Sequence, residues 1–146
     1  MRRDIPAVRI LPMSDRIKGF RGRSIEEVQQ EVFLHWLPEN NGRFRYQASG
    51  LNADPGTIVL FQFSARIIAS AVFLRDEKFA RPRRGYGGEM YFDVRSFRTF
   101  DPLDVAAMRK VWPSFHAFGH VKQCLNPTRY SLLNRRLKNV RKAVAR

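Results

Sequence analysis

Three side chains that can bind zinc stand four residues apart in the chain, at His116, His120 and Cys124. On a helix this spacing would align all three on one face, as a zinc site requires. Gly119 and the β-branched Val121 instead favour extended backbone, on which the three side chains would not converge. We therefore predict no metal site, with His116 at the surface and Cys124 as a small core residue.

Other signatures of catalysis are missing from the sequence. It contains no GxxxxGKS/T phosphate loop, no GxGxxG turn, no HExxH and no CxxC. The acidic residues are scattered, and no pair has a spacing that predicts acid–base catalysis. We expect no catalytic residue and no cofactor. The alternative is a small RNA-processing or nucleotide-modifying enzyme with His120 or His116 as general base.

Positive charge is the strongest global signal. The 146 residues include 27 Lys and Arg against 13 Asp and Glu, a formal net charge of +14. The excess gathers in residues 1–23, in residues 135–146 and in an internal cluster at Arg81, Arg83 and Arg84. A polyanion is the natural partner of such a surface, and nucleic acid is the commonest polyanion. A basic module that binds an acidic protein is the alternative.

Nucleic-acid recognition needs cations for the phosphates and planar groups for the bases. Residues 43–47 and 81–86 interleave the two kinds of side chain. The residues predicted to contact nucleic acid are Arg43, Arg45, Arg66, Arg81, Arg83, Arg84, Arg135, Arg136 and Lys138. Those predicted to line a base pocket are Tyr46, Gln47, Ser64, Tyr86, Trp112 and Gln123, with a place in the core as the favoured alternative for Trp112. For residues 43–47, an ordinary edge strand with Phe44 and Tyr46 packed inward is an equal alternative.

Local patterns predict the elements that carry these residues. The capping box at Ser24 and Glu27 begins a helix over residues 25–37, with Trp36 in the core. Strands are predicted at 43–47, 58–63, 66–73, 89–95 and 120–125, with a polar loop over 76–88. A short helix is predicted over 102–110, and a final helix from Asn126 with Tyr130, Leu133, Leu137, Val140 and Val144 on one face.

This order predicts an α+β fold, with a small twisted antiparallel sheet or pseudobarrel flanked by helices. We expect a basic N-terminal arm at 1–23, a single domain at 24–137 and a basic tail at 138–146. Cys124 is the one cysteine, which fits a reducing compartment. Without a long apolar run or a signal-peptide pattern, we expect a cytoplasmic protein and no membrane partner.

The segments Gly56-Thr57-Ile58-Val59-Leu60-Phe61 and Ile67-Ile68-Ala69-Ser70-Ala71-Val72-Phe73 form a pattern that resembles the hairpin of PUA-like domains, which include the EVE, YTH and ASCH branches. The resemblance covers roughly residues 56–137, and Thr57 stands where the family usually has aspartate. It implies a pseudobarrel that binds RNA or reads a flipped, modified base in DNA. It also implies kinship with specificity modules of modification-dependent restriction systems, in which a separate nuclease subunit cleaves.

We therefore expect a non-catalytic nucleic-acid-binding domain, with DNA favoured over RNA as the partner. The arginines at 81–84 would contact phosphates, and the basic residues after 134 would add salt-sensitive affinity.

Overall fold

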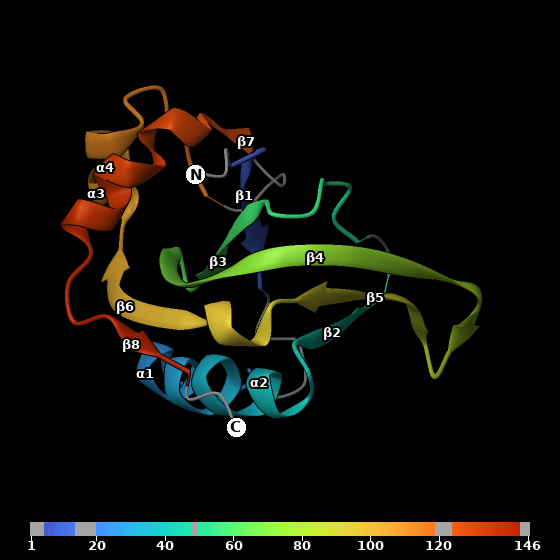
Figure 1. The fold of residues 1–146 in the computed structure, drawn as a ribbon. Helices are drawn as coiled ribbons and strands as arrows, with labels where there is room; N and C mark the ends of the chain where they lie inside the picture. The colour runs from blue at the N-terminus through green and yellow to red at the C-terminus, as the bar shows by residue number, and fades with distance from the viewer. Residues whose placement is uncertain (1–4, 14–19, 48–49, 119–123, 144–146) are drawn as a thin grey trace.

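The longest strand of the protein, β4 (Arg66–Arg83), organises the sheet in the computed structural model (Figure 1). The first half of β4 pairs with β3 (Ile58–Phe63) on one side and with β6 (Arg98–Leu103) on the other. Its second half pairs with β5 (Tyr86–Phe92). The structure describes residues 5–13, 20–47, 50–118 and 124–143.

The predicted hairpin around Ser64 and Ala65 is confirmed. These two residues have φ of 54° and 56°, the left-handed conformation that a two-residue turn between antiparallel strands requires. All six residues of β3 are buried, as is typical of so apolar a strand when both faces of the sheet are covered.

The sheet is mixed and larger than predicted. Its hydrogen-bonded path runs β2-β5-β4-β3-β1-β7, and β8 joins through β6. The strands not yet introduced are β1 (Val8–Pro12), β2 (Arg43–Tyr46), β7 (Cys124–Leu125) and β8 (Arg141–Lys142). The α+β class is confirmed, but the purely antiparallel sheet is wrong because β1 runs parallel to β3. Parallel neighbours need a long connection, and the helix and β2 between them supply it.

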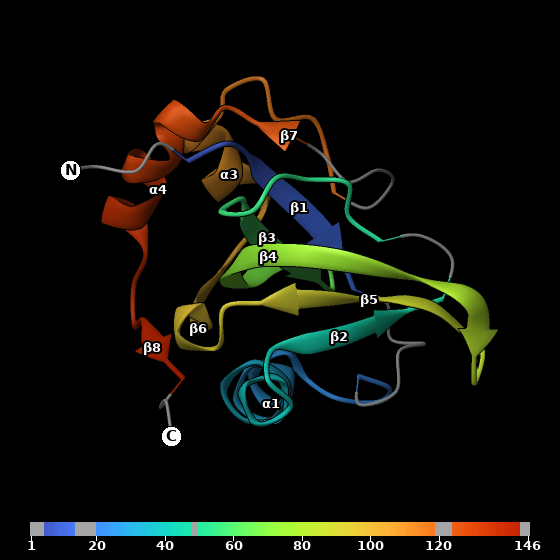
Figure 2. The same cartoon turned by 45° about the vertical axis from the view of Figure 1, so that its right-hand side comes forward.

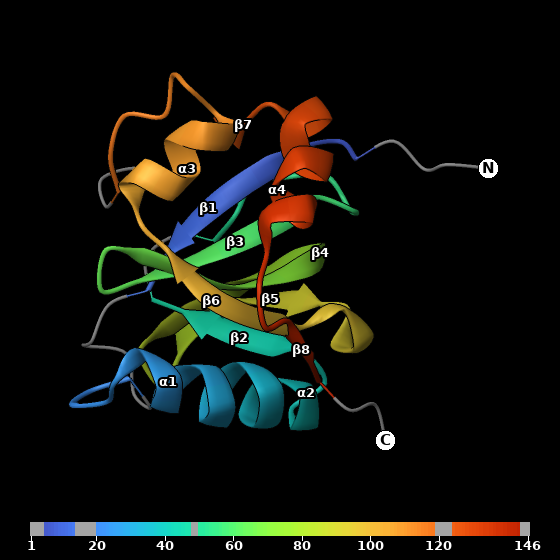
Figure 3. The same ribbon diagram turned by 90° about the vertical axis from the view of Figure 1, so that its left-hand side faces the viewer.

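A single helical segment lies along one face of the sheet (Figure 3). It comprises α1 (Ile25–Val28), the π-helical η1 (Gln29–Trp36) and α2 (Leu37–Glu39). The predicted capping box is confirmed, because Ser24 Oγ accepts from Glu27 N (3.2 Å) and Glu27 Oε1 accepts from Ser24 N (3.1 Å).

The π-helical middle changes which face is buried. Val28, Val32, Phe33 and Leu37 are buried as predicted, but Trp36 is 48% exposed, so its assignment to the core is wrong. Hydrogen bonds that span five residues widen the turn and rotate later side chains away from the stripe that an α-helical period predicts.

Two apolar cores lie on opposite faces of the central strands. The first packs the helical segment against the sheet and contains phenylalanine rings in tilted or edge-to-face contact, namely Phe20, Phe33, Phe61, Phe63, Phe73, Phe92 and Phe97. The second lies under α3 (Val105–Val111) and α4 (Tyr130–Arg136) (Figures 1 and 3). The central strands therefore contribute side chains to both cores.

The described parts of both chain ends belong to the sheet. Val8 and Ile10 of β1 are buried between β3 and β7, so this part of the predicted arm is a strand of the sheet. Near the other end, Asp101 N donates to Lys138 O (2.9 Å) and Ala143 N donates to Phe97 O (3.0 Å). The predicted tail thus lies along β6 as far as it is described.

The boundaries of α3 and α4 differ from the predicted ones. Asp104 caps α3 through Ala107 N (2.8 Å), because the preceding residues form β6 instead of a helical turn. Asn126 caps the turn before α4 as predicted. The final helix ends at Arg136, since Leu137 is extended and Asn139 has a φ of 53°.

The predicted strand at 120–125 is confirmed at its last two residues, while 119–123 lie outside the described residues. Cys124 is exposed, so its prediction as a core residue is wrong. None of the described helices has the length and apolar character needed to cross a membrane.

Candidate nucleic-acid interface

The far half of β4 and the start of β5 form a hairpin that projects from the molecule (Figures 1 and 2). Residues 76–88, predicted as a loop, are this hairpin. Arg84 and Gly85 have φ of 51° and 86°, as in the type I′ turn that joins two antiparallel strands. Gly85, which tolerates the positive φ of such a turn, is the signal that the prediction missed.

The hairpin tip carries positive charge and no negative charge. Residues 78–88 contain Lys78, Arg81, Arg83 and Arg84 and no acidic residue. All four are exposed, and the Arg83 guanidinium lies 4.5 Å from the centroid of the Phe79 ring. Within the described part of the chain, Arg81 and Arg84 form no hydrogen bond or ion pair. The structure therefore brings the three predicted arginines together at one exposed tip.

The base of the hairpin holds a network of charged side chains on its outer face. Arg45 Nε contacts Glu89 Oε1 at 3.1 Å, and the Tyr91 hydroxyl donates to Glu89 and lies 3.3 Å from Glu77 Oε2. Arg75 lies over the Tyr91 ring at 4.0 Å. Burial alone would raise the pKa of Glu89, but hydrogen bonds from Tyr91 and Arg45 hold that pKa below its usual value. Arg45, a predicted phosphate contact, is thus engaged within the protein.

Arg43, the other predicted cation of β2, is exposed and stands opposite Tyr91 in the strand register. Arg66 is exposed at the β3–β4 turn and donates to Ala65 O (2.9 Å). Neither side chain lies at the hairpin tip.

Tyr46, predicted to stack on a base, is held inside the protein. Its hydroxyl donates to Asp76 Oδ1 at 2.5 Å, and its ring packs against the first core. Burial, then the hydrogen bond and charge of Asp76, raise the pKa of Tyr46 to about 12. A Cβ at Gly50 would lie 2.7 Å from the Tyr46 ring, and a Cβ at Gly88 would collide with its hydroxyl. Gly50 and Gly88 therefore lie close against the half-buried Tyr46 side chain, whose hydroxyl is already bound within the protein.

Trp112 is also unavailable for stacking. Its side chain is 3% exposed and belongs to the second core, and its Nε1 donates to Asn126 O (3.0 Å). The alternative of a core position is therefore confirmed, and the role of Trp112 as a base-pocket residue is wrong, because packing under α3 and α4 encloses the ring.

The other predicted pocket residues do not converge. Ser64 lies at one end of β4 and Tyr86 at the opposite end, beyond the 18 residues of the strand. Gln47 is exposed after β2, and Gln123 lies outside the described residues. The structure does not assemble the six predicted residues into one pocket.

Arg135, Arg136 and Lys138 are exposed at the end of α4, on the opposite side of the molecule from the hairpin tip (Figure 1). The predicted cations therefore form separate surfaces.

The described residues contain no group of three or more His, Cys, Asp or Glu that could hold a metal ion. His116 is exposed, and its backbone carbonyl accepts from Arg109 Nη2 (2.7 Å). His120 lies outside the described residues, so its predicted role as a general base is not addressed by the structure.

Comparison of the chain with protein-family models, with curated proteins and with solved structures finds no match.

Proposed function

We propose that this protein binds nucleic acid without catalysing a reaction on it, and that the β4–β5 hairpin makes the principal contact. The observation that supports the proposal is the exposed tip, where four cations gather without an acidic residue. Like charges at such a tip repel one another in the free protein. Phosphates would relieve that repulsion and release counterions.

The shape of the hairpin favours duplex DNA as the partner. A two-stranded β-ribbon fits the major groove of B-DNA, which is about 12 Å wide. The major groove of A-form RNA is too deep and narrow for side chains to read. The projecting hairpin could enter the wide groove while its arginines contact phosphates on either side.

Recognition of a modified base rests on the PUA-like resemblance, as do the pseudobarrel and a partner nuclease subunit. The β3–β4 hairpin at the expected residues supports that resemblance. The residues predicted for the base pocket lie apart, so the proposal is restricted to binding of the duplex.

The test compares two variants that remove the same charge. Arg81→Gln with Arg84→Gln changes two exposed side chains of the tip that form no hydrogen bond or ion pair with a described residue. Arg21→Gln with Lys110→Gln changes two exposed cations outside the hairpin. Binding of a short duplex DNA and of the matching duplex RNA would be measured by fluorescence anisotropy.

We expect the hairpin variant to bind duplex DNA roughly tenfold or more weakly at moderate salt, because two phosphate contacts are lost. The control should retain the wild-type affinity within about twofold. Equal losses in the two variants would show that net charge, and not the hairpin, governs binding. Tighter binding to RNA would contradict the choice of partner.

A further inference from the structure

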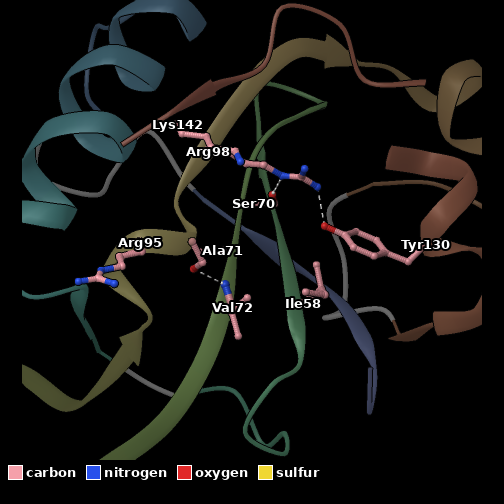
Figure 4. Close-up of a pocket in the computed structure, with 9 residues that line it drawn as sticks. Ile58, Ser70, Ala71, Val72, Arg95, Arg98, Tyr130 and Lys142 are labelled. Atoms are coloured by element: carbon pink, nitrogen blue, oxygen red, sulfur yellow. Dashed lines mark hydrogen bonds between the residues drawn. The ribbon is translucent and has the colours of Figure 1, made fainter. Parts of the chain in front are cut away.

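A cavity of about 220 Å³ lies where β6 and β8 meet α4 and the first half of β4 (Figure 4). Its polar lining comes from the cations Arg95, Arg98 and Lys142 and from the hydroxyl-bearing Ser70, Ser96 and Tyr130. None of the described residues that line it is acidic. Arg95 is on η2 (Val94–Ser96), the short turn before β6. The cavity is separate from the hairpin tip.

Arg98 is held rigidly at the centre of this lining. Its Nε donates to Ser70 Oγ (2.9 Å), and its Nη2 donates to the Tyr130 hydroxyl (2.5 Å) and to Asn134 Oδ1. Figure 4 shows the side chain reaching across from β6 to Ser70 and Tyr130. A guanidinium carries five N–H groups, so both N–H groups of Nη1 are left without an acceptor among the described residues.

The partners of Arg98 are all neutral, although the side chain is half-buried. No described carboxylate lies within ion-pair distance of its guanidinium. Asp101, the acidic residue of β6, instead accepts from Asn139 Nδ2 at 2.9 Å. A partly desolvated cation without a counter-ion is costly, and a bound anion would remove that cost.

A second cation stands directly opposite Arg98. Lys142 is its cross-strand partner in the β6–β8 register, and both side chains line the cavity. Like charges at directly opposed positions of neighbouring strands destabilise the pairing. An anion between or beside the two side chains would turn this repulsion into attraction.

The apolar residues of the lining indicate what kind of chemical group carries the anion. Ile58, Ala71 and Val72 give the cavity an apolar wall. In Figure 4 the Arg95 guanidinium points away from the other labelled side chains, so this charge lies at the rim. The volume is below the roughly 300–1,000 Å³ of pockets that enclose drug-sized ligands. It suits a phosphate with part of a sugar against the apolar wall.

We propose that Arg98 and Lys142 form a binding site for the phosphate group of a nucleotide, distinct from the contacts of the hairpin. The free N–H pair of Arg98 matches phosphate oxygens, which guanidinium groups bind in bidentate fashion. This inference rests on the proposed function only for the class of ligand, a nucleotide. The site can exist whether or not the hairpin binds duplex DNA.

The test is a titration followed by nuclear magnetic resonance of the full ¹⁵N-labelled chain. The signals to follow are the Arg98 Nε–H group and the backbone amides of Ser70 and Val72. Three ligands distinguish the source of the phosphate: inorganic phosphate, thymidine 5′-monophosphate and a thymidine dinucleotide with an internal phosphodiester. Thymidine without phosphate is the negative ligand.

Lys142→Gln, Arg98→Lys and the control Lys110→Gln would be titrated in parallel. Lys142 is exposed on a two-residue strand, so its replacement keeps the test informative if Arg98→Lys folds poorly. We expect at least one phosphate ligand to shift the Arg98 and Ser70 signals, with affinity weakened roughly tenfold by Lys142→Gln and at least as much by Arg98→Lys. The control should bind as the wild type does.

Stronger binding of the mononucleotide or the dinucleotide than of inorganic phosphate would confirm a nucleotide phosphate. Stronger binding of inorganic phosphate would overturn that assignment. The site itself would be overturned if no phosphate ligand shifts these signals, or if Lys142→Gln and Lys110→Gln weaken the binding equally. None of these results depends on duplex binding, so failure of the pocket and failure of the hairpin are separable.

Discussion

Arginine side chains in this protein differ in what their guanidinium groups contact. Arg45 binds the Glu89 carboxylate, and Arg109 donates to two backbone carbonyls. Arg81 and Arg84 bind no described residue. The formal charge therefore overstates the number of cations available to a partner, and the hairpin tip stands out because its exposed cations are clustered without an acidic residue.

Tyr46 provides a test that separates structural from binding roles. Tyr46→Phe removes the hydroxyl that donates to Asp76, leaving a half-buried carboxylate without that donor. We expect the free energy of unfolding to fall by about 1–3 kcal/mol, with duplex affinity unchanged. Urea denaturation and anisotropy measure the two quantities. Tyr86→Phe is the matched control, since the Tyr86 hydroxyl has no partner in the described structure. Loss of affinity without loss of stability would restore Tyr46 as a base contact.

Glu89 makes stability depend on acid pH. Its folded-state pKa lies below the usual 4.5, so folding favours the charged form. Its contribution to the free energy of unfolding is complete above about pH 4.5 and is lost as the pH falls through the lowered folded value. Glu89→Gln should lower stability at neutral pH and flatten the decline in acid. Urea denaturation across that pH range measures both effects, and an unchanged acid slope would contradict the assignment.

At the scale of elements, one side chain joins the helical segment to an irregular part of the sheet. The β4–β6 pairing shifts register between Ile67 and Ala69. There Gln29 Nε2 of η1 donates to Ile68 O (3.0 Å) and Phe100 O (2.7 Å), one carbonyl from each strand. The amide thus satisfies backbone acceptors at the irregularity and attaches the helix to both strands.

Gln29→Leu should therefore destabilise the protein more than the partial exposure of Gln29 suggests. Two partly buried carbonyls would lose their donor, at a cost of about 1–3 kcal/mol in the free energy of unfolding. Gln30→Leu changes the adjacent exposed residue and should alter stability by less than about 0.5 kcal/mol. Thermal and urea denaturation compare the variants. Equal effects would show that the two hydrogen bonds contribute little.

At the scale of the whole molecule, positive charge is divided between the hairpin tip and the side that carries α4, β8 and the cavity (Figure 1). The two regions lie apart because the first half of β4 pairs with β6, whereas its second half pairs with β5 and ends at the tip. A single ligand would have to span the molecule to engage both.

Salt dependence reports how many cations contact phosphate. Four hairpin cations give an expected slope of about −3.6 in log K against log salt for duplex DNA. Arg81→Gln with Arg84→Gln should reduce the slope by about two, since each lost phosphate contact removes about one. Arg21→Gln with Lys110→Gln should leave it unchanged. A slope that the hairpin variant does not alter would place the phosphate contacts elsewhere.

Local signals were enough to predict the α+β class, the capped helix after Ser24 and the β3–β4 hairpin. Each depends on residues close together in the chain: a capping box spans four residues, and a two-residue turn sets the register of its strands. The parallel placement of β1 and the exposure of Trp36 were not predictable in this way. They depend on helical winding and on contacts between distant segments.

The candidate sites divide along the same line. The cluster of arginines at the tip could be predicted because these residues are neighbours in the sequence, although the prediction for residues 76–88 is a loop and not a hairpin. Tyr46 meets Asp76 across 30 residues and Arg98 meets Tyr130 across 32. Composition and spacing show that such side chains exist, but packing of the sheet against α4 and the helical segment determines which of them meet. That packing separates the free cations from those already bound, because the register of the strands determines which side chains are neighbours.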